Sequence, residues 1–191
     1  MVPHINNLCR QCYVQLRNIA KIRSNLTEDT AATLMHAFVS SRLDSCNSLL
    51  YGLSDCELKK LQRVQNSAAR IVCGLKKHDH ITPALKKLHW LPIQQRITYK
   101  ICLMVFKTRL GEAPRYLQDI IKPYIPARHL RSSNANLVQA GKARTRYGER
   151  SFRIAGPKLW NNLPNSLRAL TDVDDFKKDP KTYLFRTAFD L

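Results

Sequence analysis

Two adjacent aspartates, Asp174 and Asp175, are the residues whose type and spacing most directly suggest catalysis. Paired carboxylates can hold the divalent cations that activate a nucleophile in phosphoryl transfer. This pair lies in the segment TDVDDFKK, however, and acidic side chains in such a position stabilise the positive N-terminus of a helix. We therefore predict that the pair begins a helix and is not catalytic.

A second group combines Cys9 and Cys12, which have the spacing of half a zinc site. The other half would need a second close pair, such as His78 and His80. Cysteines three residues apart on a helix can equally face a core, and Cys12 lies in an apolar stripe. The core interpretation is favoured, zinc remains the alternative, and we expect no metal and no other cofactor.

A third group is the triplet His78-Asp79-His80, in which two histidines flank an aspartate. Such residues can act as general acids and bases in catalysis. The triplet precedes Thr82-Pro83, a helix start signal, so a solvated turn is the better interpretation. The sequence contains neither G-x-x-x-x-G-K nor G-x-G-x-x-G, the two glycine patterns that bind nucleotide phosphates. Together these patterns predict a protein that is not an enzyme by itself.

The best functional candidates lie in the basic segment, which we define as residues 122–158. It holds nine basic residues against one acid, Glu149. Arginine forks grip phosphates, and an aromatic ring can stack on an unpaired base. The alternative is a solvated basic loop whose aromatic residues belong to the core. The candidate nucleic-acid-binding residues are Arg128, Arg131, Lys142, Arg144, Arg146, Tyr147, Arg150 and Arg153.

The whole chain is also basic, with 32 Lys and Arg against 14 Asp and Glu in 191 residues, a net charge of +18. Polyanions are the commonest partners of such an excess, because each phosphate contact releases a counterion. No apolar run approaches the ~20 residues that span a bilayer, and no signal-peptide core opens the chain. We expect an intracellular protein, in the nucleus or cytoplasm, with reduced cysteines and no membrane or small-molecule partner.

The elements that must position these residues are mainly α-helical. We expect a helical domain at 1–121, a basic irregular arm with short extended pieces at 122–165, and a C-terminal helix at 166–191. Apolar residues spaced by three and four predict helices at 3–23, from Thr27 through Leu34 and Phe38, and from Leu58 to Gly74. Others are expected from Pro92 to Leu110, with Gly111 as the stop, and from Val173 to Phe189.

Local signals refine these boundaries. Ser54 and Glu57 have the spacing of a capping box, and Thr82 should cap a helix that has proline in its first turn. Pro180 should break the last helix. The sequence also allows a short β-hairpin between 137–138 and 144–147, where Lys142, Arg144 and Arg146 would share one face of a strand.

Several segments occur here in an order that resembles one known family. These are SRLDSCNSLLYGL, LKKLQRVQNSAARIV, DHITPALKKLHWLP, RITYKICLMVFK, GEAPRYLQDII, RSSN and GPKLWNNLPNSLR, followed by DDFKK and KTYLF. They resemble the C-terminal portion of reverse transcriptases from non-LTR (LINE-type) retrotransposons, of the chicken-repeat and jockey type, from His4 to Phe185. The resemblance implies a thumb-like domain at 1–121 and a role in target-primed reverse transcription, with RNA or RNA–DNA duplex as partner.

The chain departs from that family in ways that bear on activity. It lacks the aromatic-x-Asp-Asp motif of the polymerase palm and any endonuclease residues, and Asp179-Pro180 stands where relatives usually carry two leucines. A methionine opens the chain at a mid-protein position, which suggests a truncated copy, a partial gene or a fragment retained by a host. Two rival hypotheses remain: a helical interaction module whose apolar stripe around 61–71 packs on the missing palm, or a relic without function.

Overall fold

The computed structural model describes residues 1–126, 136–145 and 147–190. In these residues the protein is mainly α-helical, as the sequence predicts, and the one β-pairing is an isolated antiparallel bridge between Pro123 and Val138. Contacts divide the chain into two compact units. Unit 1 comprises residues 1–47, 53–96 and 185–191, and unit 2 comprises residues 48–52 and 97–184. The two units are defined by contacts between residues. The three segments expected from the sequence were defined by composition and by the spacing of apolar residues.

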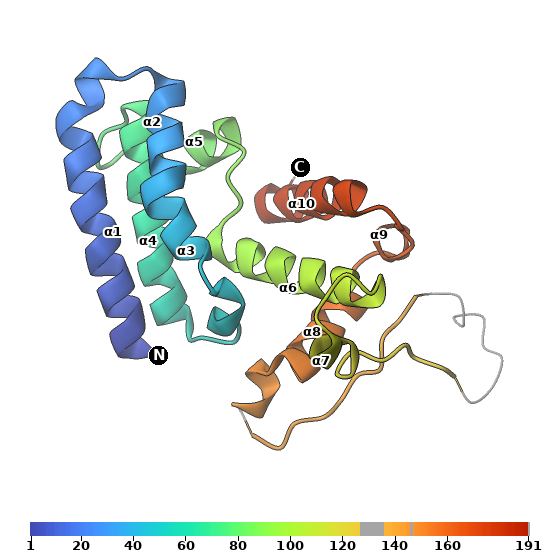
Figure 1. The fold of residues 1–191 in the computed structure, drawn as a ribbon. Helices are drawn as coiled ribbons and strands as arrows, with labels where there is room; N and C mark the ends of the chain where they lie inside the picture. Colours follow the sequence, from blue (N-terminus) through green and yellow to red (C-terminus); the bar gives the residue numbers. More distant parts are fainter. Residues whose placement is uncertain (127–135, 146, 191) are drawn as a thin grey trace. The chain divides into compact units, whose positions relative to one another are not determined.

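Unit 1 is a bundle in which the helices α1, α2 and α4 run side by side (Figure 1). Its elements are α1 (Val2–Ile22), η1 (Arg23–Asn25), α2 (Glu28–Met35), η2 (His36–Ser40), α3 (Ser41–Asp44), α4 (Asp55–Cys73), α5 (Thr82–Lys87) and the start of α6 (Ile93–Arg109). The apolar stripe that predicted the first helix is its buried face, from Ile5 to Ile19.

Two helix ends in unit 1 form as the sequence predicts. The hydroxyl of Thr27 accepts a hydrogen bond from the backbone N–H of Thr30, at 3.2 Å, and so caps α2. Gly74 ends α4 in the left-handed conformation, with a φ of +65°, which is strained for residues that carry a Cβ. Both signals act within a few residues, so neither depends on the rest of the fold.

Arg23 joins the end of α1 to the end of α4. Its guanidinium donates to the carbonyl oxygens of Ile71 at 2.9 Å and Val72 at 2.7 Å. The last carbonyls of a helix have no partner within the helix, and they carry the negative end of its dipole. Arg23 therefore provides a partner for the Val72 carbonyl and a second one for the Ile71 carbonyl, which also accepts from the Gly74 N–H at 3.4 Å.

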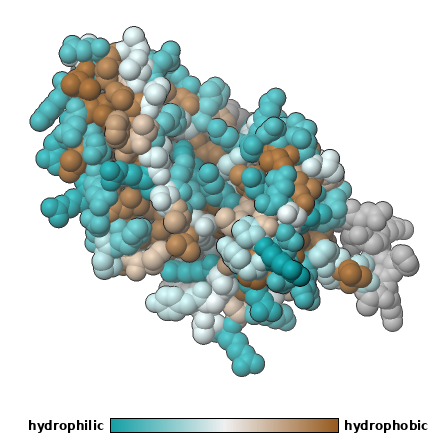
Figure 2. All heavy atoms as spheres, viewed as in Figure 1, coloured by the Kyte–Doolittle hydropathy of each residue, from teal (hydrophilic) through white to brown (hydrophobic). Residues whose placement is uncertain are grey.

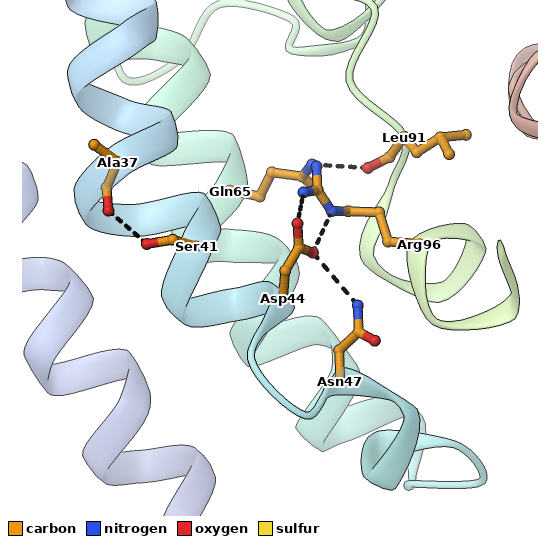
Figure 3. A network of polar contacts seen from close by, with 7 residues as sticks. All are labelled: Ala37, Ser41, Asp44, Asn47, Gln65, Leu91 and Arg96. Atoms are coloured by element: carbon orange, nitrogen blue, oxygen red, sulfur yellow. Dashed lines mark hydrogen bonds and ion pairs between the residues drawn. The ribbon is translucent and has the colours of Figure 1, made fainter. Parts of the chain in front are cut away.

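A polar network fixes the start of α6 within unit 1 (Figure 3). The Arg96 guanidinium makes a two-pronged ion pair with the Asp44 carboxylate, with 2.9 Å between Nε and Oδ1. The buried amide of Gln65 donates to the Leu91 carbonyl at 2.8 Å, and the Gln62 side chain accepts from the Ile93 N–H at 2.9 Å. Gln65 lies in an apolar stripe because its amide has partners there: it donates to the Leu91 carbonyl and accepts from the Gln62 side chain at 3.0 Å.

Between α2 and α3 the helical run contains a π-helical turn, His36–Ser40. Such a turn carries one residue more than an α-helical turn and shifts the side chains that follow. Val39 is fully buried while Phe38 is 45% exposed. The prediction that Phe38 belongs to the core stripe is therefore wrong: the buried residues of this run are Ala31, Met35, Val39 and Leu43, so the buried face is displaced by one residue from Leu34 and Phe38.

Unit 2 is built around the remainder of α6. Its further elements are α7 (Arg115–Gln118), η4 (Gly148–Arg150), α8 (Phe152–Asn161), α9 (Asn165–Arg168) and most of α10 (Val173–Phe189), while η3 (Asn47–Leu50) crosses the boundary between the units. The core is aromatic: the rings of Phe106 and Phe176 stack with centroids 4.0 Å apart, and Trp160 lies 5.6 Å from Phe176. All three side chains are almost fully buried, so three helices distant in the sequence share one centre.

Trp160 and Leu163 are both buried in the core of unit 2. Trp160 lies on α8, a helix inside the region that the sequence predicted to be irregular. Gly156 and Pro157 are buried within this helix. A Cβ on Gly156 would lie 3.0 Å from Val105, so glycine is needed for close packing rather than for a turn.

Three further local predictions are wrong. Pro180 does not break the last helix: α10 is continuous from Val173 to Phe189, and Pro180 is buried in it. Ser54 precedes α4 without a side-chain capping bond: the Glu57 N–H donates to the backbone carbonyl of Ser54 at 3.0 Å, and the Glu57 carboxylate pairs with Lys60 at 2.9 Å. Thr82 is the first residue of α5 rather than its cap.

The hairpin is also not formed as predicted. Val138 bridges Pro123, and residues 144, 145 and 147 adopt no strand. Arg146 lies outside the described residues, so the shared strand face of Lys142, Arg144 and Arg146 is not part of the described fold.

The apolar stripe around 61–71 belongs to the core of unit 1. Leu61, Val64 and Ala68 are at most 1% exposed. The suggestion that this stripe is an orphaned interface is therefore wrong. On the face drawn in Figure 2, hydrophobic residues reach the surface in separate groups among hydrophilic ones. No helix among the described residues is long and apolar enough to cross a membrane.

Candidate nucleic-acid interface

Residues 137–139 of the basic segment are held in unit 2 by hydrogen bonds to residues 122–124 on one side and to Asn161 on the other. On one side, Tyr124 N–H donates to the Leu137 carbonyl at 3.0 Å and Gln139 N–H donates to the Lys122 carbonyl at 2.8 Å. On the other, the Asn161 side chain accepts from the Val138 N–H and donates to the Val138 carbonyl. The amide of Asn161 thus replaces a neighbouring strand, and residues 137–139 have a fixed path.

Trp160 secures the same stretch from the core. Its indole N–H donates to the Asn136 carbonyl at 2.8 Å, and the Arg109 guanidinium lies 4.9 Å over the ring. Burial, and then the nearby charge of Arg168, lower the pKa of Arg109 from its usual value. The path of residues 136–139 is therefore set by core residues and by backbone partners.

Beyond this stretch, the chain borders a hollow of about 490 Å³, which we call the larger hollow. Its cationic residues are Lys142 on the extended chain, Arg150 at the end of η4 and Lys158 on α8. Ile154 and Lys158 are four residues apart on α8 and so lie on the same helix face. Residues far apart in the sequence thereby bring three positive charges to one cavity.

Two glycines allow the walls of the larger hollow to meet. A Cβ on Gly141 would lie 2.8 Å from Ile154 Cδ1, so a larger residue there would require the end of the Ile154 side chain to shift. A Cβ on Gly52 would lie 3.0 Å from Arg150 Cγ, and Gly52 also has a φ of +69°. Arg150 thus packs directly over a glycine, and its Nε is buried without a hydrogen-bond partner among the described residues.

A second, smaller hollow of about 260 Å³ shares Gly141 with the larger one. Lys122 and Arg153 line it, together with Asp119 and the backbone of residues 139–141. The two hollows therefore adjoin along the same stretch of extended chain. Together they gather five of the basic residues of the segment.

Some of the predicted site residues line the two hollows, and others lie outside them. Lys142 and Arg150 meet in the larger hollow, and Arg153 lines the smaller one. Arg144 is exposed, and Tyr147, 83% exposed, lies with its ring 5.7 Å from the Arg150 guanidinium. Phe152 packs on the core of unit 2, as the alternative interpretation of the aromatic residues proposed. Arg128, Arg131 and Arg146 lie outside the described residues.

The ion pairs of the described residues leave the basic segment unneutralised. Four are formed, and they are Lys60–Glu57, Lys87–Glu28, Arg96–Asp44 and Lys177–Asp174. None of them uses a residue of the basic segment. Unpaired cations beside a cavity favour an anionic ligand, since phosphate oxygens can accept the hydrogen bonds that the protein leaves open.

The other candidate groups have ordinary structural environments. Asp174 and Asp175 lie in the first turn of α10, as predicted, and their N–H groups both donate to the Asp172 carboxylate. Asp79 accepts from the Lys76 N–H at 2.7 Å in a turn where His78 and His80 are exposed, which confirms the solvated turn.

The cysteines vary in exposure. Cys12 is fully buried, as the core interpretation predicts, and burial raises the pKa of its thiol to about 11. Burial raises the pKa of Cys102 in unit 2 to about 12. The described residues contain no cluster of three His, Cys, Asp or Glu residues able to hold a metal ion.

The sequence does not reveal two kinds of site residue. Lys122 and Lys158 contribute to the charge count, but nothing local distinguishes them from surface lysines. Tyr51 lines the larger hollow from a turn about ninety residues earlier in the chain, and no sequence signal connects it to the basic segment.

Comparisons with known proteins add no relative to this geometry. No protein-family model matches the sequence, no curated protein matches it, and no solved structure matches the fold.

Proposed function

We propose that this protein is a non-catalytic module that binds RNA or RNA–DNA duplex through backbone phosphates. The observation that carries the proposal is the basic segment, whose described cations have no acidic partners and line two adjoining hollows. Contacts to phosphate provide affinity and position but read no bases, so binding should be largely independent of sequence.

The family resemblance supports the same partner. The segments from His4 to Phe185 resemble the C-terminal portion of LINE-type reverse transcriptases, which copy RNA at a nicked DNA end. Within that proposal the chain acts as the part of an RNA-directed DNA polymerase that holds nucleic acid. Its one pair of adjacent aspartates, Asp174 and Asp175, serves as a helix start, which supports the proposal that the chain does no phosphoryl transfer.

Binding is tested by fluorescence anisotropy with labelled RNA duplex and RNA–DNA hybrid over a range of salt concentrations. We expect affinity on the order of micromolar at moderate salt, falling steeply as salt rises, because released counterions drive the association. The variant Arg144→Ala combined with Arg153→Ala should bind about tenfold more weakly for every sequence, with the salt slope reduced by about 2.

The matched control is Lys59→Ala combined with Lys77→Ala, which removes the same charge from exposed positions of unit 1. It should change affinity much less than the Arg144 and Arg153 variant. Affinity that stays flat with salt, or equal losses in the two variants, would contradict binding by the basic segment. Extension of a primer by the purified chain alone would contradict a non-catalytic role.

A further inference from the structure

We propose that the larger hollow of unit 2 holds one unpaired nucleotide, with its phosphate on the cations and its base against Tyr51. This inference rests on the proposed function, because it assigns a particular part of the nucleic acid to one of the two hollows. It adds a consequence that phosphate binding alone does not have: a preference for strands that offer an unpaired base.

The size of the larger hollow suits such a ligand. Its volume of about 490 Å³ lies within the ~300–1,000 Å³ of pockets that take small organic ligands. The smaller hollow, at about 260 Å³, lies below that range. The larger hollow can therefore take a base and sugar as well as a phosphate, whereas the smaller one suits a phosphate of the continuing backbone.

The cations of the larger hollow provide the phosphate contact. Lys142, Arg150 and Lys158 approach it from three different elements. The side chain of Arg150 is half-buried and packs over Gly52, which keeps the guanidinium beside the hollow. A phosphate there would meet three cations that form no ion pair among the described residues.

Tyr51 provides a surface for the base. It is half-buried, it lines the same hollow as the three cations, and it comes from outside the basic segment. Aromatic rings stack on any base, so a tyrosine next to clustered cations is the combination that holds single strands. Stacking requires the base to be free of its partner strand, which is why the ligand is an unpaired nucleotide.

Glu149 distinguishes a nucleotide from a bare phosphate. Its carboxylate also lines the larger hollow, where it would repel a second anion. A carboxylate only accepts hydrogen bonds, and it therefore suits a base edge that presents N–H donors, as guanine does. We accordingly use guanine in the test strands.

The test compares three labelled RNA–DNA hybrids in anisotropy titrations at fixed salt: a blunt hybrid, the same hybrid with a three-guanosine overhang, and one with a three-residue abasic overhang. The guanosine overhang should bind at least about fivefold more tightly than the abasic one, which has equal phosphates but no bases. Equal affinities for the guanosine and abasic overhangs would overturn the inference.

Variants at Tyr51 link the preference to the hollow. Tyr51→Leu keeps apolar bulk but loses the aromatic ring, so it should remove the fivefold difference without changing the affinity for the blunt hybrid. Tyr51→Phe should retain the difference. Tyr116→Ala removes a tyrosine of unit 2 that is 66% exposed and does not line the hollow, and it should behave like the parent protein.

Circular dichroism spectra and melting curves of the Tyr51 variants would show that the fold is intact. A preference that persists in folded Tyr51→Leu would place the base elsewhere and overturn the inference. If the blunt hybrid binds in a salt-dependent manner while the overhang gives no gain, the inference fails and the proposed function stands. If no strand binds even in dilute buffer, the proposed function itself fails.

Discussion

The two units carry a similar excess of positive charge but use it differently. Unit 1 has 15 basic and 7 acidic residues, and unit 2 has 17 and 7, which gives +8 and +10. Three of the four ion pairs of the described residues lie in unit 1, and Arg23 there binds helix carbonyls. Among the described residues, the basic segment of unit 2 forms none. Net charge therefore does not distinguish the two units, whereas the use of their described cations in ion pairs does.

The difference also shows how each unit holds its polar residues. In unit 1 a carboxylate and a guanidinium fix the start of α6, at Asp44 and Arg96. In unit 2 the path of residues 136–139 depends on Trp160, on Asn161 and on backbone pairing, none of which uses a charged side chain. A substitution in the core of unit 2 tests whether aromatic packing supports that unit. Charge substitutions in each unit test how much its charged side chains contribute to the free energy of unfolding.

The largest effect is expected from Phe106→Ala, which removes a buried ring that stacks on Phe176 in the centre of unit 2. Loss of apolar burial plus the remaining cavity should lower the free energy of unfolding by about 3–5 kcal/mol. Urea denaturation followed by circular dichroism measures the change. Tyr116→Ala, at an exposed position, serves as the control, and equal losses in the two variants would show that the stacked rings are not the support of unit 2.

A smaller loss is expected from Asp44→Ala, which leaves the mostly buried guanidinium of Arg96 without its carboxylate. The free energy of unfolding should fall by about 1–3 kcal/mol, measured by urea denaturation. The double variant Asp44→Ala with Arg96→Met should recover part of the loss, because no unpaired charge remains. Asp174→Ala breaks the exposed Lys177 pair and should have less effect; a larger effect than at Asp44 would contradict the contrast.

The smallest effect on stability is expected in the basic segment. Lys142→Gln, Arg144→Gln and Arg153→Gln together should change the free energy of unfolding by less than about 0.5 kcal/mol, since these exposed cations form no ion pair among the described residues. Thermal melts and urea curves measure it. A clear stabilisation would mean that mutual repulsion is significant, and a clear loss would mean that these residues support the fold rather than a ligand.

The contrast between local and long-range contacts explains which elements the sequence could reveal. Thr27 and Gly74 act within a few residues, so their helix ends follow from the sequence. Pro180 was expected to break the last helix because proline lacks an N–H and its ring clashes with the preceding turn. The helix continues through it, and Pro180 is buried within α10. Helix type and helix ends were predictable where the deciding contacts are close in sequence.

The candidate site was only partly predictable for the same reason. Composition located the basic segment, and Lys142 and Arg150 do share a cavity. The pairing partner of Val138 proved to be Pro123, which altered the expected hairpin. Tyr51 reaches the larger hollow only through the fold, so no reading of residues 122–158 could have included it.

The extra residue in the π-helical turn His36–Ser40 has a consequence for how unit 1 tolerates length changes. The wide turn already accommodates this residue, so deleting one residue there should restore regular winding while the four residues that follow keep nearly the same direction. Asp44 would then still face Arg96, and the start of α6 would keep its anchor. A one-residue insertion in the regular turns of α2 would instead rotate the following residues by about 100° around the helix axis, so it should damage the contact between Asp44 and Arg96, which are 52 positions apart.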